Sequence, residues 1–378
     1  MAPGEAASTT AFISFSSGTS GLVKGVKLSH SNVVANVFQM KQRLPEMYGN
    51  DTVSALVVPF FHILGLSGFC CQYLTMGVPI VVFERFEMEA LLQSIKRDRI
   101  THLNIVPPLA LQFLSDPLAR KGDYSSIKAL INAAAPLKQE IADKLSELMG
   151  CAVTQWYGMT EASPAVACQR EGEVNVQNTV GKLHYGMALR IVDEEGNDCA
   201  EGEPGEFWIT GPNIMQGYTT SEHRDVNGAF VNGYLKTGDI GYRDRAGFLY
   251  LLDRAKEMIK VKGNQVAPAE LEAIILTHTA VSDAAVCGLE VVAEGTEYPV
   301  AYITTGVVGA KAQQDLIADV RKYVDSRVAG YKRLRGGVYI VSQIPRNPAG
   351  KILRRLLPAN AAKTTAKAVK TGGSASKL

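Results

Sequence analysis

The fold class follows from three short apolar segments, VPIVVF (Val78–Phe83), HLNIVP (His102–Pro107) and IKALINAA (Ile127–Ala134). Beside them, apolar residues recur at helical spacing, at Met88, Leu91, Leu92 and Ile95, and again at Ile141, Leu145 and Leu148 before Gly150. Buried strands that alternate with amphipathic helices are typical of βαβ units. We therefore predict an α/β fold whose large domain holds a mostly parallel sheet with helices packed on its faces.

The pattern of apolar and turn residues changes twice farther along the chain. From about Gly181, short strand patterns are separated by turn residues, which predicts a β-rich module. Beyond Asp253 a βα pattern resumes, with strands near Ala284–Gly288 and Val300–Thr304 and helices after Pro268 and near Leu316–Val328. We expect a partial large domain (1–180), its β-rich module (181–253), a hinge (254–256), a small mobile α+β domain (257–358) and a flexible tail (359–378).

Composition excludes several classes of protein. The 378 residues are 46% hydrophobic and carry a formal charge of +2, so the chain can bury a full core and offers no concentrated basic face for nucleic acid. The six cysteines have neither disulfide-framework nor zinc-ligand spacing, and we interpret them as reduced core thiols.

One stretch, Thr52–Phe83, has no charged side chain other than His62 and by length alone could span a bilayer. Prolines and glycines cut it into strand-sized pieces. We therefore expect buried strands of the parallel sheet here and no transmembrane segment.

The segment SFSSGTSGLVKG (Ser14–Gly25) combines hydroxyl donors, glycines that let backbone N–H groups approach an anion, and the charge of Lys24. It does not have Walker spacing, and the flanking segments AFISF and GVKLSH both have strand patterns, so we expect a hairpin loop. Alone, this segment predicts only a turn.

Six segments together resemble the acyl-adenylate-forming superfamily, and the nearest branch is similar to 4-coumarate-CoA ligases and firefly luciferase. They are SSGTSGLVKGVKLSH (Ser16–His30), QWYGMTEA (Gln155–Ala162), GEFWITGPNIMQGY (Gly205–Tyr218), YLKTGDIG (Tyr234–Gly241), LLDRAKEMIKVKGNQVAPAELE (Leu251–Glu272) and PRNPAGKILRR (Pro345–Arg355). They occur in the family's order over some 340 residues.

The resemblance implies an ATP site. Ser16, Ser17, Gly18, Thr19, Ser20, Gly21 and Lys24 would hold the β- and γ-phosphates, Gln155 would contact the cofactor, Tyr157 would stack on adenine, and Thr160 would reach the α-phosphate. Asp239 and Arg254 would bind the ribose, and Glu161 would hold Mg²⁺ through hard oxygen ligation. Lys351 would bridge the substrate carboxylate and the α-phosphate, because attack of one anion on another needs positive charge.

The resemblance also implies a second pose of the small domain for thioester formation. Lys256 would be the hinge, Lys260 would contact nucleotide, and Lys262, Gly263 and Arg85 would contact CoA. His62 would gate the wall of the acyl pocket.

The pocket residues depart from the family pattern. Leu64 and Gly68 stand where 4-coumarate-CoA ligases tend to carry Tyr and Ser. Their lack of hydroxyl groups weakens polar binding of a phenolic acid. Trp156 stands where the family commonly has a glycine and would narrow the acyl pocket. Ala134 is one of the small residues that would line this pocket. Relatives also carry about a subdomain of sequence before the phosphate loop, so we expect open sheet edges and apolar faces here; the sequence is either incomplete or that of a degraded homologue.

The chain ends in Ser376-Lys377-Leu378, the address that the peroxisomal import receptor reads, after a Lys-, Thr-, Gly- and Ala-rich tail. Together these features predict a peroxisomal carboxylate-CoA ligase that uses ATP, Mg²⁺ and CoA on an aryl, arylalkyl or fatty acid. Two alternatives stay open: a truncated non-catalytic homologue, and an adenylating enzyme whose second step is oxygenation or carrier-protein loading.

Overall fold

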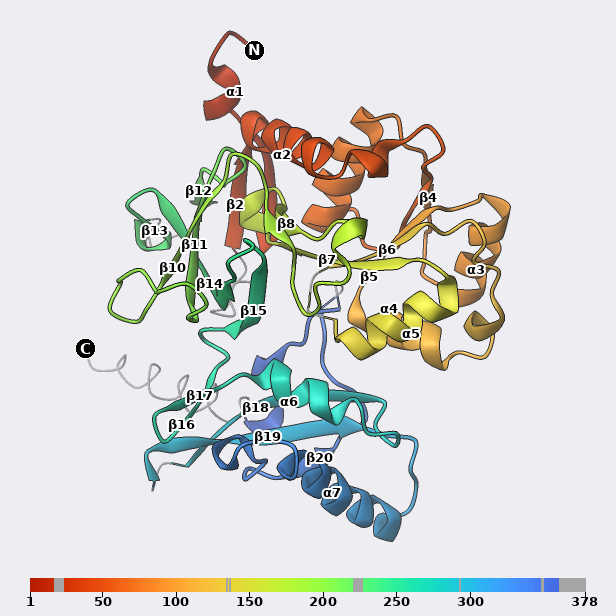
Figure 1. Ribbon diagram of the computed structural model, residues 1–378, viewed down its shortest axis with the longest axis vertical. Helices are drawn as coiled ribbons and strands as arrows, with labels where there is room; N and C mark the ends of the chain where they lie inside the picture. The colour runs from red at the N-terminus through yellow and green to blue at the C-terminus, as the bar shows by residue number, and fades with distance from the viewer. Residues whose placement is uncertain are drawn as a thin grey trace, which may run out of the picture. The chain divides into compact units, whose positions relative to one another are not determined.

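The computed structural model describes residues 1–16, 24–133, 135, 137–219, 227–291, 294–347 and 350–359. Its contacts divide the chain into two compact units. The N-terminal unit is built mainly from the described residues of Met1–Leu251, and the C-terminal unit mainly from those of Leu252–Asn347 and from residues 351–359. Figure 1 draws both units, and each is described by itself below.

A mostly parallel sheet forms the centre of the N-terminal unit, as predicted. Its strand order is β4-β3-β5-β6-β7-β8-β9, in which β3 to β7 pair in parallel and the last two pairings are antiparallel. The strands are β3 (Ser54–Leu56), β4 (Ile80–Val82), β5 (His102–Ile105), β6 (Ala129–Asn132), β7 (Ala152–Gly158), β8 (Ala165–Cys168) and β9 (Lys182–Leu183). Since the chain steps from β3 to β4 on one side and then to β5 on the other, the order switches direction at β3.

Helices cover both faces of this sheet. One face packs against α3 (Met88–Arg97), α4 (Pro107–Ser115) and α5 (Gln139–Met149) through an apolar core that includes Leu91, Phe113 and Leu145. The predicted helical periodicities correspond to α3 and α5, and α5 ends at Gly150 with a φ of 66°, which favours glycine. The other face packs against α2 (His30–Arg43), η1 (Pro45–Tyr48) and η2 (Leu64–Tyr73).

The charge-free stretch is only partly strand, which corrects the prediction. Its ends form β3 and β4, but its middle forms the π-helix η2. The prediction was wrong there because Gly65 allows the helix to lie against the preceding loop: a Cβ on Gly65 would come within 2.4 Å of the Pro59 carbonyl oxygen. Among the described residues, no helix is long and apolar enough to cross a membrane.

Antiparallel strands make up the rest of the N-terminal unit. The strands that flank the glycine- and serine-rich loop, β1 (Thr10–Ser16) and β2 (Lys24–Ser29), pair antiparallel, which confirms a hairpin, and β12 (Gly217–Thr219) pairs with β2. A second sheet confirms the β-rich module; it contains β10 (Ala188–Val192), β11 (Gly205–Thr210), β13 (Phe230–Val231), β14 (Tyr234–Arg243) and β15 (Leu249–Arg254). The short elements are α1 (Glu5–Ser8), η3 (Ala119–Lys121), η4 (Thr160–Ala162), η5 (Glu171–Glu173) and η6 (Asn227–Ala229).

The C-terminal unit has its own core, which includes Leu271, Val286 and Val320. Its sheet pairs β18 (Asp283–Val291) with β19 (Thr296–Thr304) in antiparallel and β19 with β20 (Val338–Ile340) in parallel. The remaining elements are β16 (Ile259–Val261), β17 (Asn264–Val266), α6 (Pro268–Ile275), α7 (Ala310–Asp325), η8 (Gly330–Lys332) and η9 (Arg354–Leu356). Pro268 begins α6, as expected, and the later predicted helix begins and ends earlier in the chain than the sequence pattern placed it.

Two further observations concern an exposed strand and the thiols. The strand β1 is the outer strand of the described sheet β1-β2-β12, and its residues Ile13 and Phe15 are 52% and 72% exposed. All six cysteines are free, as predicted, but Cys70, Cys71 and Cys199 are only partly buried and so are not core thiols.

Candidate functional site

Several of the predicted site residues lie where the parallel strands end. The turn after β7 carries Thr160 and Glu161, His62 follows β3, and Arg85 follows β4. The carboxyl ends of neighbouring parallel strands share one edge, and ligands of open α/β sheets bind there near a switch in strand order. The sheet therefore provides a common location for these side chains.

Tyr157 and Asp239 form a buried pair. The Tyr157 hydroxyl donates a hydrogen bond of 2.6 Å to Asp239 Oδ2, although 82 residues separate them. Both residues are nearly inaccessible, at 7% and 6% exposed, and the tyrosine ring packs edge-on against Phe207. The hydroxyl of Thr237 accepts a hydrogen bond from the Asp239 backbone N–H, so this part of β14 is held in place. The structure thus joins two residues that the sequence placed in different motifs.

Glu161 is the second buried carboxylate. Its Oε1 accepts hydrogen bonds from the hydroxyls of Ser16, at 3.2 Å, and Tyr218, at 2.9 Å. Lys24 lies over the Tyr218 ring, 4.7 Å from the centroid, and pairs with Ser16 across the hairpin. The base of the predicted phosphate loop therefore meets the predicted metal ligand. The predicted loop residues Ser17, Gly18, Thr19, Ser20 and Gly21 lie outside the described residues.

Hydrogen bonds from other elements fix the turn that carries Glu161. The Ser67 hydroxyl of η2 donates to the Ser163 carbonyl, and the side-chain amide of Asn213 donates to the carbonyls of Ala162 and Ala165. Asn213 is fully buried. The turn is thereby tied to η2 on one side and to the segment before β12 on the other.

Asn213 and Tyr218 are site residues to which the sequence analysis assigned no role. Both belong to the segment Gly205–Tyr218, which carried part of the resemblance. An asparagine between an apolar strand and an aromatic strand end was the available signal. The hydrogen-bond partners lie some 50 residues away in sequence, at Ala162 for Asn213 and at Glu161 for Tyr218.

Gln155 and Thr160 flank Tyr157 in the sequence. Gln155 is 6% exposed, and its side-chain oxygen accepts a hydrogen bond from the Leu137 backbone N–H, so it anchors the loop that follows β6. The predicted pocket residue Ala134 belongs to that loop but lies outside the described residues. Thr160 begins the turn η4 and is partly exposed.

His62 caps the start of η2. Its Nδ1 accepts a hydrogen bond from the Leu64 backbone N–H, which leaves the proton of the neutral ring on Nε2. Burial lowers the pKa of His62, because the low-dielectric surroundings disfavour the charged ring. A neutral imidazole at this position is a potential hydrogen-bond donor through Nε2.

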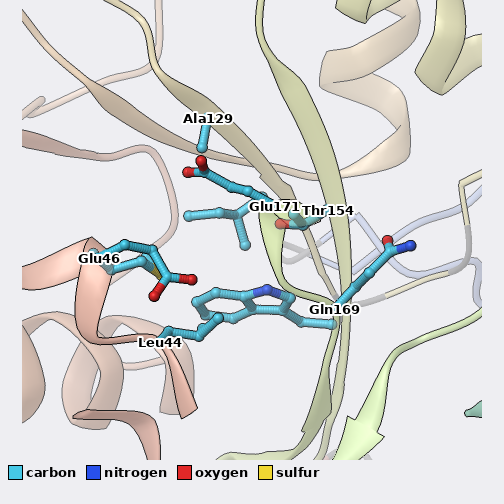
Figure 2. Close-up of a pocket in the computed structure, with 9 residues that line it drawn as sticks. Leu44, Glu46, Ala129, Thr154, Gln169 and Glu171 are labelled. Carbon is cyan, nitrogen blue, oxygen red and sulfur yellow. The ribbon is translucent and has the colours of Figure 1, made fainter. Parts of the chain in front are cut away.

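Leu64, Gly68 and Trp156 pack together in the predicted pocket region. Leu64 covers Gly68, since a Cβ on that glycine would lie 2.9 Å from a Leu64 methyl carbon, and both Leu64 and Trp156 contact the apolar cluster of η2. A small cavity of about 10 Å³ lies beside Trp156. Glu46 and Thr154 line opposite sides of this cavity (Figure 2). The Trp156 indole N–H is buried without a hydrogen-bond partner among the described residues.

The remaining predicted residue of the N-terminal unit, Arg85, is exposed in the connection between β4 and α3. No described contact joins it to the residues around Tyr157 or Glu161, and the structure brings it only to the same edge of the sheet.

The predicted cations of the C-terminal unit follow one another along a turn and a hairpin. Arg254 ends β15 and is partly buried, whereas Lys256, Lys260 and Lys262 are exposed. Lys262 and Gly263 form the two-residue turn between β16 and β17, with φ values of 47° and 85°. Two positive φ values match a type I′ turn, which favours glycine at its second position. Lys262 Nζ lies 3.4 Å from Glu294, and hydrogen bonds to Tyr298 and Glu294 raise its pKa.

Lys351 lies in a turn stabilised by reciprocal hydrogen bonds. Its N–H donates to the side-chain oxygen of Asn347 at 2.8 Å, and the Asn347 N–H donates to the Lys351 carbonyl at 2.9 Å. The bridge between Arg346 and Ile352 closes the turn. The lysine is partly exposed, so its side chain is positioned by a defined backbone without being buried.

The donor set around Glu161 fits Mg²⁺. Among the described residues, no group of three or more His, Cys, Asp or Glu could hold a metal by protein ligands alone. Protein-bound Mg²⁺ commonly uses one or two carboxylates together with phosphate oxygens and water. A single buried carboxylate beside the phosphate loop suits that mode.

Two family models match the chain. The model described as AMP-binding enzyme matches residues 2–219, and the model described as AMP-binding enzyme C-terminal domain matches residues 270–351. The first match alone covers more than half of the chain and includes every candidate residue from Ser16 to Glu161.

Curated relatives and solved structures agree with these matches. A probable 4-coumarate-CoA ligase 1 of Dictyostelium discoideum is 39% identical over 92% of this chain and 63% of its own length. A peroxisomal OPC-8:0-CoA ligase 1 of Arabidopsis thaliana is 37% identical over 92% of this chain and 63% of its own length. The structure of o-succinylbenzoate CoA synthetase from Bacillus subtilis with its acyl-adenylate intermediate has a TM-score of 0.81 at 29% identity and covers 93% of this chain and 69% of that chain. The chain thus spans about 63% of the length of these curated relatives.

Proposed function

The chain belongs to the AMP-binding enzyme family, and on that premise we propose that it is an ATP-dependent carboxylate-CoA ligase. The proposal rests on one structural observation: two buried carboxylates, Asp239 and Glu161, lie beside the end of β7 and are each held by hydroxyl donors. Such a pair can serve a nucleotide, because one carboxylate can accept ribose hydroxyls while the other faces the phosphates.

In the proposed reaction, an oxygen of the acid attacks the α-phosphorus of ATP, the bond to pyrophosphate breaks, and an acyl-AMP forms. The sulfur of CoA then attacks the acyl carbon, AMP leaves with the former acid oxygen, and the thiol proton passes to solvent or AMP. No protein nucleophile is required, so the proposed reaction needs no catalytic role for the free cysteines.

We propose the following roles for residues that bind the nucleotide. Tyr157 stacks on adenine, and Asp239 and Arg254 bind the ribose. Gln155 positions the loop after β6 through its hydrogen bond with the Leu137 N–H. Thr160 reaches the α-phosphate. Ser16 and Lys24, with Ser17, Gly18, Thr19, Ser20 and Gly21, hold the β- and γ-phosphates. Glu161 holds Mg²⁺, which when bound spreads the negative charge that develops on the phosphates.

The roles that we propose for the other substrates depend on the C-terminal unit and on the end of β3. Lys351 bridges the acid and the α-phosphate, Lys260 contacts nucleotide, and Lys256 is the pivot between two poses. Lys262, Gly263 and Arg85 contact CoA, and His62 gates the acid. The support is the exposure of Lys256, Lys260 and Lys262 and the defined turns that carry Lys262 and Lys351.

The proposed acid is aryl, arylalkyl or fatty. Leu64 and Trp156 give the pocket region an apolar lining, and the named relatives act on 4-coumarate or OPC-8:0. We also propose a peroxisomal location. Its support is the terminal Ser376-Lys377-Leu378, which lies outside the described residues, and the peroxisomal relative from Arabidopsis thaliana. A fluorescent fusion that keeps these three residues at its end should enter peroxisomes, and deletion of the three should abolish entry.

The test of the proposed activity is exchange of labelled pyrophosphate into ATP by the purified chain across a panel of aryl and fatty acids. We expect exchange that depends on both Mg²⁺ and an acid, and we expect Lys351→Ala to abolish it. Lys311→Ala removes an exposed lysine of α7 and should leave exchange unchanged. Absence of exchange with every acid would favour the non-catalytic alternative. Exchange without acyl-CoA formation would favour a different second step.

A further inference from the structure

Arg354 lies three residues after Lys351 and is almost fully enclosed within the C-terminal unit. Its guanidinium donates to both carboxylate oxygens of Glu272, at 2.8 and 2.7 Å, to the Val286 carbonyl at 3.0 Å, and to Glu257. The side chains of Arg354 and Glu272 are 11% and 9% exposed. A planar guanidinium that binds a carboxylate in bidentate fashion has a fixed orientation.

Three carboxylates surround the positive charge of Arg354. Burial opposes its positive charge, but Glu272, Glu257 and Asp253 outweigh this effect and raise its pKa. Burial raises the pKa of Asp253 and of Glu272, and the nearby positive charge of Arg354 acts on both in the opposite direction. Removal of Arg354 would therefore leave acidic groups buried without their counter-ion.

The partner Glu257 belongs to the turn that carries two other candidate residues. The backbone N–H groups of Glu257 and Met258 both donate to the Arg254 carbonyl. Asp253 accepts hydrogen bonds from the Arg254 N–H and from the Ala269 N–H at the start of α6. The turn 253–258 is thus fixed to the same unit as Arg354.

The turn that carries Lys351 is held on both flanks. On one side Arg346 pairs with Asp283 at 2.8 Å, and on the other the Leu353 N–H donates to the Pro345 carbonyl just before Arg354. The side chain of Arg354, just after this turn, reaches the turn of Arg254 and Lys256 through Glu257.

We propose that Arg354 is a positioning residue for the ligase reaction: by binding Glu272 and Glu257 together, it holds Lys351 in a fixed relation to Arg254 and Lys256. This inference rests on the proposed function, in which Arg254 binds the ribose, Lys351 bridges the acid and the α-phosphate, and Lys256 is the pivot. Arg354 itself does not touch substrate. A displacement of about 1 Å in a reacting geometry costs on the order of 100-fold in rate, so a loosened turn has a large expected effect.

The test compares three single variants of the full chain. Glu257→Gln removes the charge that joins the two turns but leaves the Arg354–Glu272 pair intact, so it should still fold. Arg354→Met removes the whole link. Arg321→Met is the matched control, since Arg321 pairs with Asp325 at 3.8 Å on the exposed surface of α7 in the same unit. Exchange of backbone amide hydrogens and exchange of labelled pyrophosphate into ATP are measured for each.

We expect Glu257→Gln to speed amide exchange in residues 254–258 and 351–357 together, and to slow pyrophosphate exchange about tenfold. Arg354→Met, if folded, should slow pyrophosphate exchange on the order of 100-fold. A fourth variant that combines Glu257→Gln with Arg354→Met should be no slower than Arg354→Met alone. Arg321→Met should change neither measurement. Unchanged amide exchange in Glu257→Gln would overturn the proposal, and so would loosened turns with a wild-type rate of pyrophosphate exchange. If the wild-type chain exchanges no pyrophosphate, the proposed function fails, while the amide-exchange comparison still decides whether Arg354 couples the two turns.

Discussion

Replacement of Tyr157 by phenylalanine isolates the buried pair at the centre of the site. The change removes only the hydroxyl that donates at 2.6 Å to Asp239 Oδ2 and keeps the ring against Phe207. A hydrogen bond to a charged group contributes about 1.5–3 kcal/mol, and a buried acceptor that loses its donor cannot recover the bond from water. Since Tyr157 and Asp239 are 7% and 6% exposed, we expect the free energy of unfolding to fall by about 2 kcal/mol.

The measurement is urea unfolding followed by circular dichroism. Tyr250→Phe is the matched control, because it removes a hydroxyl that donates at 3.1 Å to Asp244 in a less buried part of the same unit. The control should lose under about 1 kcal/mol. A loss in Tyr157→Phe below about 0.5 kcal/mol, or one equal to that of the control, would refute the assignment of a stabilising buried hydrogen bond between Tyr157 and Asp239.

Three further predictions follow from the same site and its surroundings. His102 and His184 are 2% exposed, and burial lowers the pKa of each to about 4. The two histidines therefore bind protons more readily in the unfolded state than in the folded state. Their contribution to the free energy of unfolding is full above about pH 6.5 and falls toward pH 4, by on the order of 3 kcal/mol for each group. A free energy of unfolding that stays constant over this range would contradict the burial effect. Lys262→Glu should leave pyrophosphate exchange unchanged but slow acyl-CoA formation, because it places a carboxylate opposite Glu294 where we propose that CoA binds; equal loss of both steps would disprove the assignment to CoA. Trp156→Ala should cost about 3 kcal/mol in stability and extend pyrophosphate exchange to bulkier acids, and an unchanged size preference would place Trp156 outside the acid pocket.

The sequence predicted the elements whose pattern is local. The periodicity at Met88–Ile95 and Ile141–Leu148 identified α3 and α5, and short apolar runs identified β4, β5 and β6. The same rule was wrong at Leu64–Tyr73, since a continuous apolar run has no period that distinguishes a strand from a buried helix. There the decisive feature is the approach of Gly65 to the Pro59 backbone, which is a tertiary contact.

The pairings within the candidate site could not be predicted from the chain order. The motifs named Tyr157, Asp239, Ser16 and Glu161 separately, but the hydrogen bonds that join them cross 82 and 145 residues. Tyr218 and Asn213 were missed as site residues because their roles are defined by hydrogen bonds to η4, from Tyr218 to the Glu161 carboxylate and from Asn213 to the Ala162 carbonyl. Arg354 shows the same limit, because its position beside Glu257 and Glu272 depends on how the C-terminal unit folds.

Transfer of an oxygen label tests most directly whether this chain activates carboxylic acids as adenylates. The chain is supplied with Mg²⁺, ATP, CoA and an acid whose carboxylate carries ¹⁸O, and the AMP and inorganic products are weighed by mass spectrometry. Attack on the α-phosphorus predicts one ¹⁸O atom in each AMP formed and none in pyrophosphate. Unlabelled AMP, or label in inorganic phosphate, would contradict the adenylate chemistry that we propose for Asp239, Glu161 and Lys351.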